Sequence, residues 1–236
     1  MGGIVTDDPS RWQAAPVWRE WLQLTRLQWS GRIAFETELR RWNDPFLAGG
    51  DKLSVRISDC GGEYETSFDN HLVALRDVSQ YCGLILVKSW ALLEGHAKLV
   101  AHLDLQGRLA DLFDRGQVED LAAADDHILA GGVEAWGSDL LRRVGQDWDK
   151  VFEGQAGLVE VSLVRNAVAH GRRHATEALI QSARARSAEF PYATGEEIVL
   201  DFDRLHNYRG RIRSFCRIVC DGALHLSRGT HKELRV

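Results

Sequence analysis

The stretch LVEVSLVRNAVAHG, from Leu158 to Gly171, gives the clearest indication of the fold class. Its apolar residues recur at helical spacing and cover most of the helix circumference, which predicts a largely buried helix over 157–170. Gly171 follows His170 directly, at the place where helices often end in a left-handed glycine. Because a buried helix needs other helices around it, the stretch favours a mainly α protein.

Three polar side chains, Arg165, Asn166 and His170, enter the second part of this stretch, VRNAVAHG at 164–171. Asn166 and His170 are four residues apart and share a helix face, whereas Arg165 projects from the crowded surface, where an unpaired guanidinium is costly. One interpretation is structural, because cations near a helix C-terminus interact well with the helix dipole. The other is a chemical site, because the same dipole favours an imidazolium that holds and donates a proton.

The remaining sequence predicts more helices and little strand. Helical patterns are expected over 16–42 with a break near 29–32, over 70–105, in two or three pieces between 107 and 145, over a basic segment at 172–190, and over 205–224. Alternating residues predict a hairpin from 51–59 and 63–68 and a short strand at 196–202. We therefore expect a Trp-rich N-terminal region with the hairpin at 1–68, which can pack on a helical domain at 69–236.

Glu94 lies in an apolar stripe of the 70–105 helix, between Trp90 and Ala97. A carboxylate in such a stripe needs a partner, as the guanidinium of Arg165 does. We expect Glu94 to support the site by pairing with Arg165 across the bundle. The alternative is a local pair with Lys98 on the same helix.

The composition is that of an ordinary globular protein, with 236 residues and a formal net charge of -5. From Arg165 onward there are 13 Lys and Arg against 8 Asp and Glu, whereas the whole chain has 29 against 34. The C-terminal third can thus present a basic face to an anionic partner. No apolar run is long enough to span a bilayer and no signal-like N-terminus is present, so we expect a cytoplasmic protein without membrane contact.

Several other kinds of site lack support in the sequence. None of the four cysteines forms a Cys-x-x-Cys pair, and the His170 and His174 pair is interrupted by Gly171, so no metal is expected. Asp203 is expected to cap the last helix rather than to bind a metal with Asp201. Neither a Walker loop nor a dinucleotide fingerprint is present, and we expect no cofactor.

Arginines recur every four residues on the last helix, at Arg209, Arg213 and Arg217. Together with Arg172 and Arg173 they are candidates for RNA binding, because such a stripe can follow a phosphate backbone. The alternative for the stripe is an ordinary solvated helix face.

The residues Arg165, Asn166 and His170 within RNAVAHG resemble the signature of HEPN domains, in which an Arg precedes a His by four to six intervening residues, commonly with a polar residue after the Arg. The resemblance covers about 70–224 and is specific only at this motif. It implies a helical bundle that pairs as a homodimer, with both motif helices lining one cleft. It further implies an endoribonuclease that cleaves RNA without metal, as a toxin or an antiviral (phage-defence) effector.

In this interpretation His170 transfers protons, Arg165 stabilises the phosphorane, and Asn166 orients His170 or holds a phosphate oxygen. An antitoxin or another regulatory partner is a further expectation. Some HEPN toxins carry a modifiable tyrosine two residues after the His, where this chain has Arg172. The alternatives are a non-catalytic HEPN-like module that binds RNA, a nucleotide or a protein, and a sensor that a ligand or partner activates.

Overall fold

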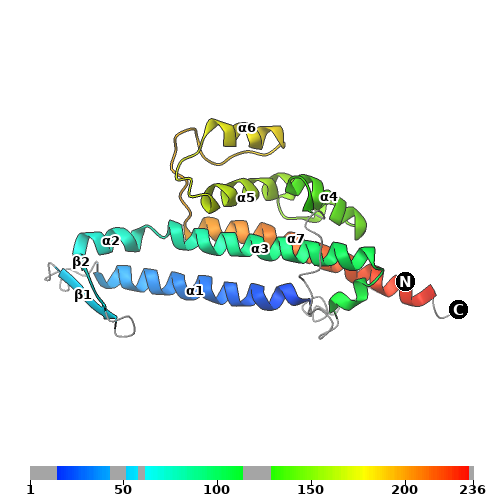
Figure 1. Cartoon of the computed structure of the whole chain (residues 1–236), viewed down its shortest axis with the longest axis horizontal. Helices are drawn as coiled ribbons and strands as arrows, with labels where there is room; N and C mark the ends of the chain where they lie inside the picture. Colours follow the sequence, from blue (N-terminus) through cyan, green and yellow to red (C-terminus); the bar gives the residue numbers. More distant parts are fainter. Residues whose placement is uncertain (1–14, 43–51, 58–61, 114–128, 234–236) are drawn as a thin grey trace, which may run out of the picture.

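The computed structural model describes residues 15–42, 52–57, 62–113 and 129–233, and it confirms a mainly α protein. Three long helices run along the molecule: α1 (Pro16–Trp42), α3 (Ser79–Leu105) and α7 (Phe202–Glu233). The shorter helices α4 (Val133–Arg143) and α5 (Gly154–Ala169) lie over α3 and α7, and α6 (Glu177–Ala185) is outermost (Figure 1). The short 3-10 helices η3 (Leu109–Phe113) and η6 (Trp148–Lys150) lie in the connections between these helices.

The predicted hairpin is confirmed. Strands β1 (Lys52–Ile57) and β2 (Gly62–Ser67) pair in antiparallel register, with Leu53 opposite Thr66 and Val55 opposite Tyr64. The hairpin lies at one end of the molecule, next to α2 (Phe68–Arg76) (Figure 1). Ser67 caps α2 by accepting a hydrogen bond from the Asn70 amide.

Helix α1 is continuous, so the predicted break near 29–32 is wrong. Gly31 lies within the helix, and its missing side chain makes room for Tyr81. The Tyr81 hydroxyl lies where a Cβ would be and donates to the Leu27 carbonyl over 2.7 Å. The buried residues of α1 include Trp18 and Trp21, which belong to the same core cluster as residues of α3, α5 and α7. The Trp-rich region therefore packs on the bundle through α1.

Two other predicted elements differ from the structure. The helix expected over 70–105 divides into α2 and α3, because the Asp77 carboxylate accepts a hydrogen bond from the Ser79 amide and starts a new helix. The strand expected at 196–202 is absent apart from one bridge between His174 and Glu197. No neighbouring strand pairs with it among the described residues, and the Leu200 amide donates to the Ser79 hydroxyl instead.

The last helix is capped by Asp201 and not by Asp203 as predicted. The Asp201 carboxylate accepts a hydrogen bond from the Arg204 amide over 2.7 Å, which is the geometry of an N-cap. Asp203 lies in the first turn of α7 and accepts from Arg32 on α1 over 2.7 Å.

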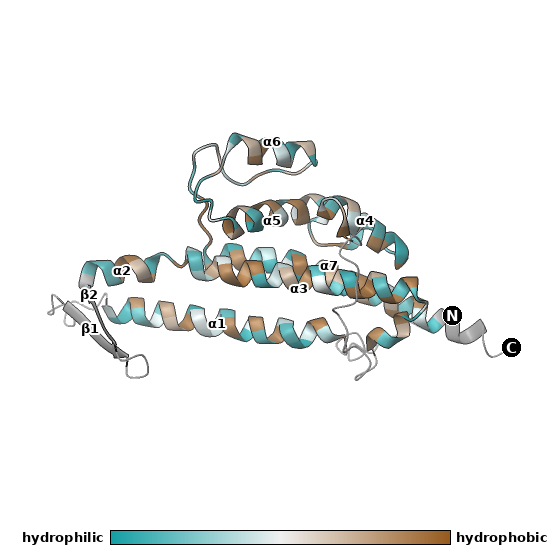
Figure 2. Cartoon of the chain, viewed as in Figure 1, coloured by the Kyte–Doolittle hydropathy of each residue, from teal (hydrophilic) through white to brown (hydrophobic). Residues whose placement is uncertain are grey.

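Helices α3 and α7 form the centre of the core. Most of α3 is apolar (Figure 2), and its buried residues include Leu86, Trp90, Leu93 and Val100. Burial over most of its circumference fits the central position that α3 takes between α1 on one side and α4 and α5 on the other, and a narrow face that includes Leu84 and Ala91 stays exposed.

His96 is a buried titratable group within this core. Its Nε2 lies 3.3 Å from the Sγ of Cys220, and burial lowers its pKa to about 4. A histidine with a lowered folded pKa loses stability as the pH falls, because the unfolded chain takes up the proton first. We expect the free energy of unfolding to fall by up to about 1.4 kcal/mol per pH unit between about pH 6.5 and pH 4.

Urea unfolding at several pH values measures this dependence. The matched variant His96→Gln keeps the size of the side chain and removes the titration, so its stability should change less over the same interval. Equal pH dependence in both proteins would contradict this assignment of the proton uptake to His96.

Candidate functional site

The C-terminal end of α5 has the geometry of a Schellman motif. The amide of Arg172 donates to the carbonyl of Ala167 over 2.9 Å, and that of Gly171 donates to Val168 over 3.0 Å. Gly171 has a φ of 65°, which favours glycine, so its predicted role as a helix cap is confirmed. His170 is the C-cap residue and its side chain is exposed at the negative end of the helix dipole.

Arg165 is held by three neighbours in the layer between α3 and α5. Its NH2 donates to Glu94 Oε1 over 2.8 Å and its NH1 donates to Asn166 Oδ1 over 2.7 Å. The guanidinium also lies 5.3 Å from the ring centroid of Trp90, at cation–π distance. The predicted pair between Glu94 and Arg165 is therefore present, and it joins α3 to α5.

Glu94 is itself fixed by a second donor. The indole nitrogen of Trp90 donates to Glu94 Oε1 over 2.6 Å, so this one oxygen accepts from both Trp90 and Arg165. The sequence placed Trp90 in the stripe with Glu94 but gave it no role in the site. Its spacing, four residues before an acid, was the available signal, because side chains four apart on a helix are neighbours.

The site is partly exposed to solvent. The side chain of Arg165 is 20% exposed and that of Glu94 is 37% exposed. Arginine has five N–H donors in a fixed fork, and the hydrogen bonds to Glu94 and Asn166 use two of them. The guanidinium is thus oriented and partly exposed; its Nε is buried without a partner, so the second hydrogens of the two terminal nitrogens are the donors left for an anion.

His170 lies apart from this cluster within one chain. On α3, Val168 packs against Gly83, where an added Cβ would lie 2.7 Å from the Val168 side chain. Arg165 instead contacts Trp90, further along the same helix. Gly83 and Trp90 are seven residues apart on α3, or about 10 Å along the axis. No hydrogen bond joins His170 to Arg165 or Asn166 within the described part of the chain, and Asn166 is turned to Arg165.

Four of the five candidate RNA-binding arginines are exposed: Arg172, Arg173, Arg213 and Arg217. Arg217 lies 4.0 Å from Asp221 on the same helix. Arg172 and Arg173 come after His170 and Gly171, in the loop that leaves α5. These two arginines form a basic surface beside the exposed imidazole of His170.

Arg209 is the exception, and its prediction as an RNA-binding residue is wrong. It is only 4% exposed, because its side chain lies against residues of α1 and α3. Its guanidinium donates to Gln28, to the Thr25 hydroxyl over 3.0 Å and to the Ser89 hydroxyl over 3.1 Å, and it lies 4.5 Å from the Trp21 ring. Burial lowers the pKa of Arg209 to about 10, and among the described residues no carboxylate pairs with it.

A second buried arginine, Arg211, fixes the start of α5. It donates to Glu160 over 2.6 Å, forms an ion pair with Glu153, and donates to the Gly157 carbonyl over 3.2 Å. Glu160 also accepts from the Tyr208 hydroxyl over 2.9 Å. The sequence gave no role to this network, because acids spaced along one helix do not reveal which arginine faces them. It anchors α5 on α7 and so holds the motif helix in place.

The pair between Glu94 and Arg165 should contribute a modest, measurable coupling to stability. We expect Glu94→Gln and Arg165→Met each to lower the free energy of unfolding by about 1 kcal/mol, a value reduced because both groups are partly exposed. Denaturant unfolding of the wild type, both single variants and the double variant gives the coupling energy. Effects that add within about 0.3 kcal/mol would show that the contact contributes nothing.

Comparisons with models of protein families, with curated proteins and with solved structures returned no match. Within the described ranges, no three His, Cys, Asp or Glu side chains gather as a metal site would require. In the same ranges, none of the helices combines the length and apolar character of a membrane span.

Proposed function

We propose that this protein is a metal-independent endoribonuclease of the HEPN type, acting as a toxin or phage-defence effector. The observation that carries the proposal is the fixed, accessible guanidinium of Arg165 on the same helix as the exposed His170. An oriented guanidinium suits the pentacoordinate phosphorane, which gathers negative charge on its oxygens. An exposed imidazole can give or take a proton near neutral pH.

The reaction needs a base and an acid on opposite sides of the phosphorus. The ribose 2′-oxygen loses its proton and forms a bond to phosphorus, and the bond from phosphorus to the 5′-oxygen breaks as that oxygen gains a proton. With two copies of the chain, one His170 takes the first proton and the other donates the second. Arg165 binds the equatorial oxygens through its free N–H donors.

A cleft between two copies also accounts for the separation of the two residues in one chain. Arg165 and His170 are five residues apart on α5, or about 7.5 Å along its axis, and no hydrogen bond joins them among the described residues, where Arg165 is instead bonded to Glu94 and Asn166. A second α5 placed against the first brings one copy's imidazole to the other's guanidinium. In this arrangement the exposed Arg172 and Arg173 flank the RNA backbone.

Incubation of the purified protein with RNA in buffer containing EDTA tests this function. We expect cleavage at a rate unaffected by EDTA and products that end in a 2′,3′-cyclic phosphate. Absence of cleavage at high enzyme concentration, with RNA or nucleotide binding retained, would instead favour the non-catalytic module. Cleavage that requires a divalent metal would contradict the proposed chemistry.

A further inference from the structure

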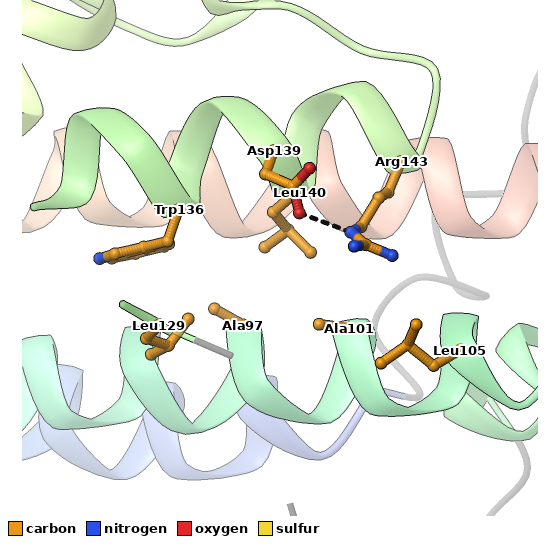
Figure 3. Close-up of a pocket in the computed structure, with 8 residues that line it drawn as sticks. All are labelled: Ala97, Ala101, Leu105, Leu129, Trp136, Asp139, Leu140 and Arg143. Atoms are coloured by element: carbon orange, nitrogen blue, oxygen red, sulfur yellow. Dashed lines mark hydrogen bonds and ion pairs between the residues drawn. The ribbon is translucent and has the colours of Figure 1, made fainter. Parts of the chain in front are cut away.

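A cavity of about 210 Å³ lies between α3 and α4 and has no role in the chemistry above. On the α3 side it is walled by Ala97 and Ala101, whose small side chains leave space opposite Trp136 of α4 (Figure 3). Cavities that take drug-sized ligands are about 300–1,000 Å³, so this one fits a single compact ring system.

One edge of the cavity is polar. Figure 3 shows the guanidinium of Arg143 at the far end from Trp136 and the carboxylate of Asp139 between them, joined to Arg143 by a hydrogen bond of 2.6 Å. Arg143 also donates to Asp104 over 3.2 Å, and Asp139 accepts from Arg142. These two acids and two arginines balance in charge, so the cavity favours a neutral ligand over an anion.

The polar edge still offers hydrogen bonds to such a ligand. A carboxylate has about four acceptor positions, and the two arginines use two of those on Asp139. The hydrogen bond from Arg143 lowers the pKa of Asp139, which keeps it an acceptor. The NH2 of Arg143 makes no hydrogen bond with any described residue, so it remains a donor beside that acceptor.

The cavity begins one helical turn from the candidate site. Ala97 follows Glu94 by three residues on α3, or about 5 Å along the axis, and Ala101 lies about 10 Å from Glu94. Figure 3 places the cavity on the side of α3 that faces α4, and Glu94 meets α5 on the same side of the bundle. Arg165 is thus between the exposed His170 and the cavity.

We propose that this cavity binds one unpaired base of the RNA, whose neighbouring phosphate lies at Arg165; the identity of the occupant rests on the proposed function. Trp136 supplies the aromatic wall that an unstacked base requires. Asp139 accepts from an exocyclic amine and Arg143 donates to the adjacent ring nitrogen. On their Watson–Crick edges adenine and cytosine carry an amine beside an unprotonated ring nitrogen, whereas guanine carries its amine beside a protonated one, so adenine and cytosine fit the polar edge.

Titration of the wild-type protein with adenosine, cytidine, guanosine and uridine tests the cavity without any cleavage. The readout is the indole N–H resonance of Trp136, identified by its loss in Trp136→Phe. We expect saturable shifts with adenosine or cytidine at a Kd on the order of 1 mM and weaker effects with uridine and guanosine. In Ala101→Leu, which fills the cavity, the affinity should fall at least 10-fold.

The matched control is Ala91→Leu, an equal change on the exposed face of α3. It should bind the nucleosides like the wild type. Sequencing of RNA fragments should also show that Ala101→Leu loses the preference for adenine or cytosine beside the cut, whereas Ala91→Leu keeps it.

The outcomes separate the two proposals. RNA cleavage without any nucleoside effect on Trp136 would overturn the base-binding cavity and leave the nuclease standing. Saturable nucleoside binding that Ala101→Leu removes, in a protein that does not cleave RNA, would support the cavity and overturn the nuclease. Equal shifts with all four nucleosides in both alanine variants would overturn the cavity as the site.

Discussion

His170→Ala is expected to lower the rate of RNA cleavage by about 10²–10⁴-fold, the usual contribution of a positioned acid or base. The same change should leave the melting temperature almost unaltered, because the side chain is exposed. The cap geometry should also survive, since Gly171 and the amide of Arg172 provide it. Initial rates on a labelled RNA, measured beside thermal unfolding, give both quantities.

His174→Ala is the matched control for this variant. His174 is exposed in the same loop and contributes only a backbone bridge to Glu197. We expect it to retain cleavage within a few-fold of the wild type. Equal rates for wild type and His170→Ala would remove His170 from the chemistry, and equal losses in both histidine variants would point to the loop as a whole.

Arg209→Ala is expected to lower the free energy of unfolding by about 3 kcal/mol or more, the largest stability effect of any arginine change considered. The change removes a buried side chain and leaves Gln28, Thr25 and Ser89 without their donor. Because these partners lie on α1 and α3, the loss should loosen α1 first. Denaturant unfolding and amide exchange of α1 measure the effect.

Arg217→Ala provides the contrast on the exposed face of α7. It should keep the wild-type stability within about 0.5 kcal/mol. The slope of the logarithm of the RNA-binding constant against the logarithm of the salt concentration should become smaller by about 1, the value for one lost phosphate contact. If Arg209→Ala proved as stable as the wild type and weakened RNA binding instead, the buried position of Arg209 would be contradicted.

These two arginines show where the sequence was informative and where it was not. A stripe with a spacing of four residues has the same pattern whether water or another helix covers it, so Arg209 could not be distinguished from Arg213 and Arg217. Arg209 is buried by contacts with residues that lie far away in the sequence, such as Gln28 on α1, which is more than 180 positions away. Local periodicity carries no information on such contacts.

The pairing of Glu94 with Arg165 could be predicted because each charge interrupts an apolar stripe. Two opposite charges that both need a partner in one core limit the arrangements that a bundle can adopt. The helix end at Gly171 was predictable for a local reason, since only a left-handed residue completes the cap. That Arg165 turns to Glu94 and Trp90 and not to His170 depends instead on how α5 packs on α3, which no short motif specifies.

The cavity beside α4 could not be predicted from the sequence either. Ala97 and Ala101 are unremarkable in an apolar stripe, and the space opposite them depends on the position of Trp136 on another helix. Its polar edge arises from Asp139 and Arg143, which a sequence pattern assigns to an ordinary helix pair.

The most direct test of the central claim compares two RNAs that differ in one oxygen atom. The wild-type protein is incubated in EDTA with an RNA containing its cut site and with the same RNA carrying a single 2′-deoxyribose on the 5′ side of that site. We expect cleavage of the first RNA, with a 2′,3′-cyclic phosphate end, and no cleavage at the modified position of the second. Cleavage of both RNAs at that position would contradict attack by the 2′-hydroxyl.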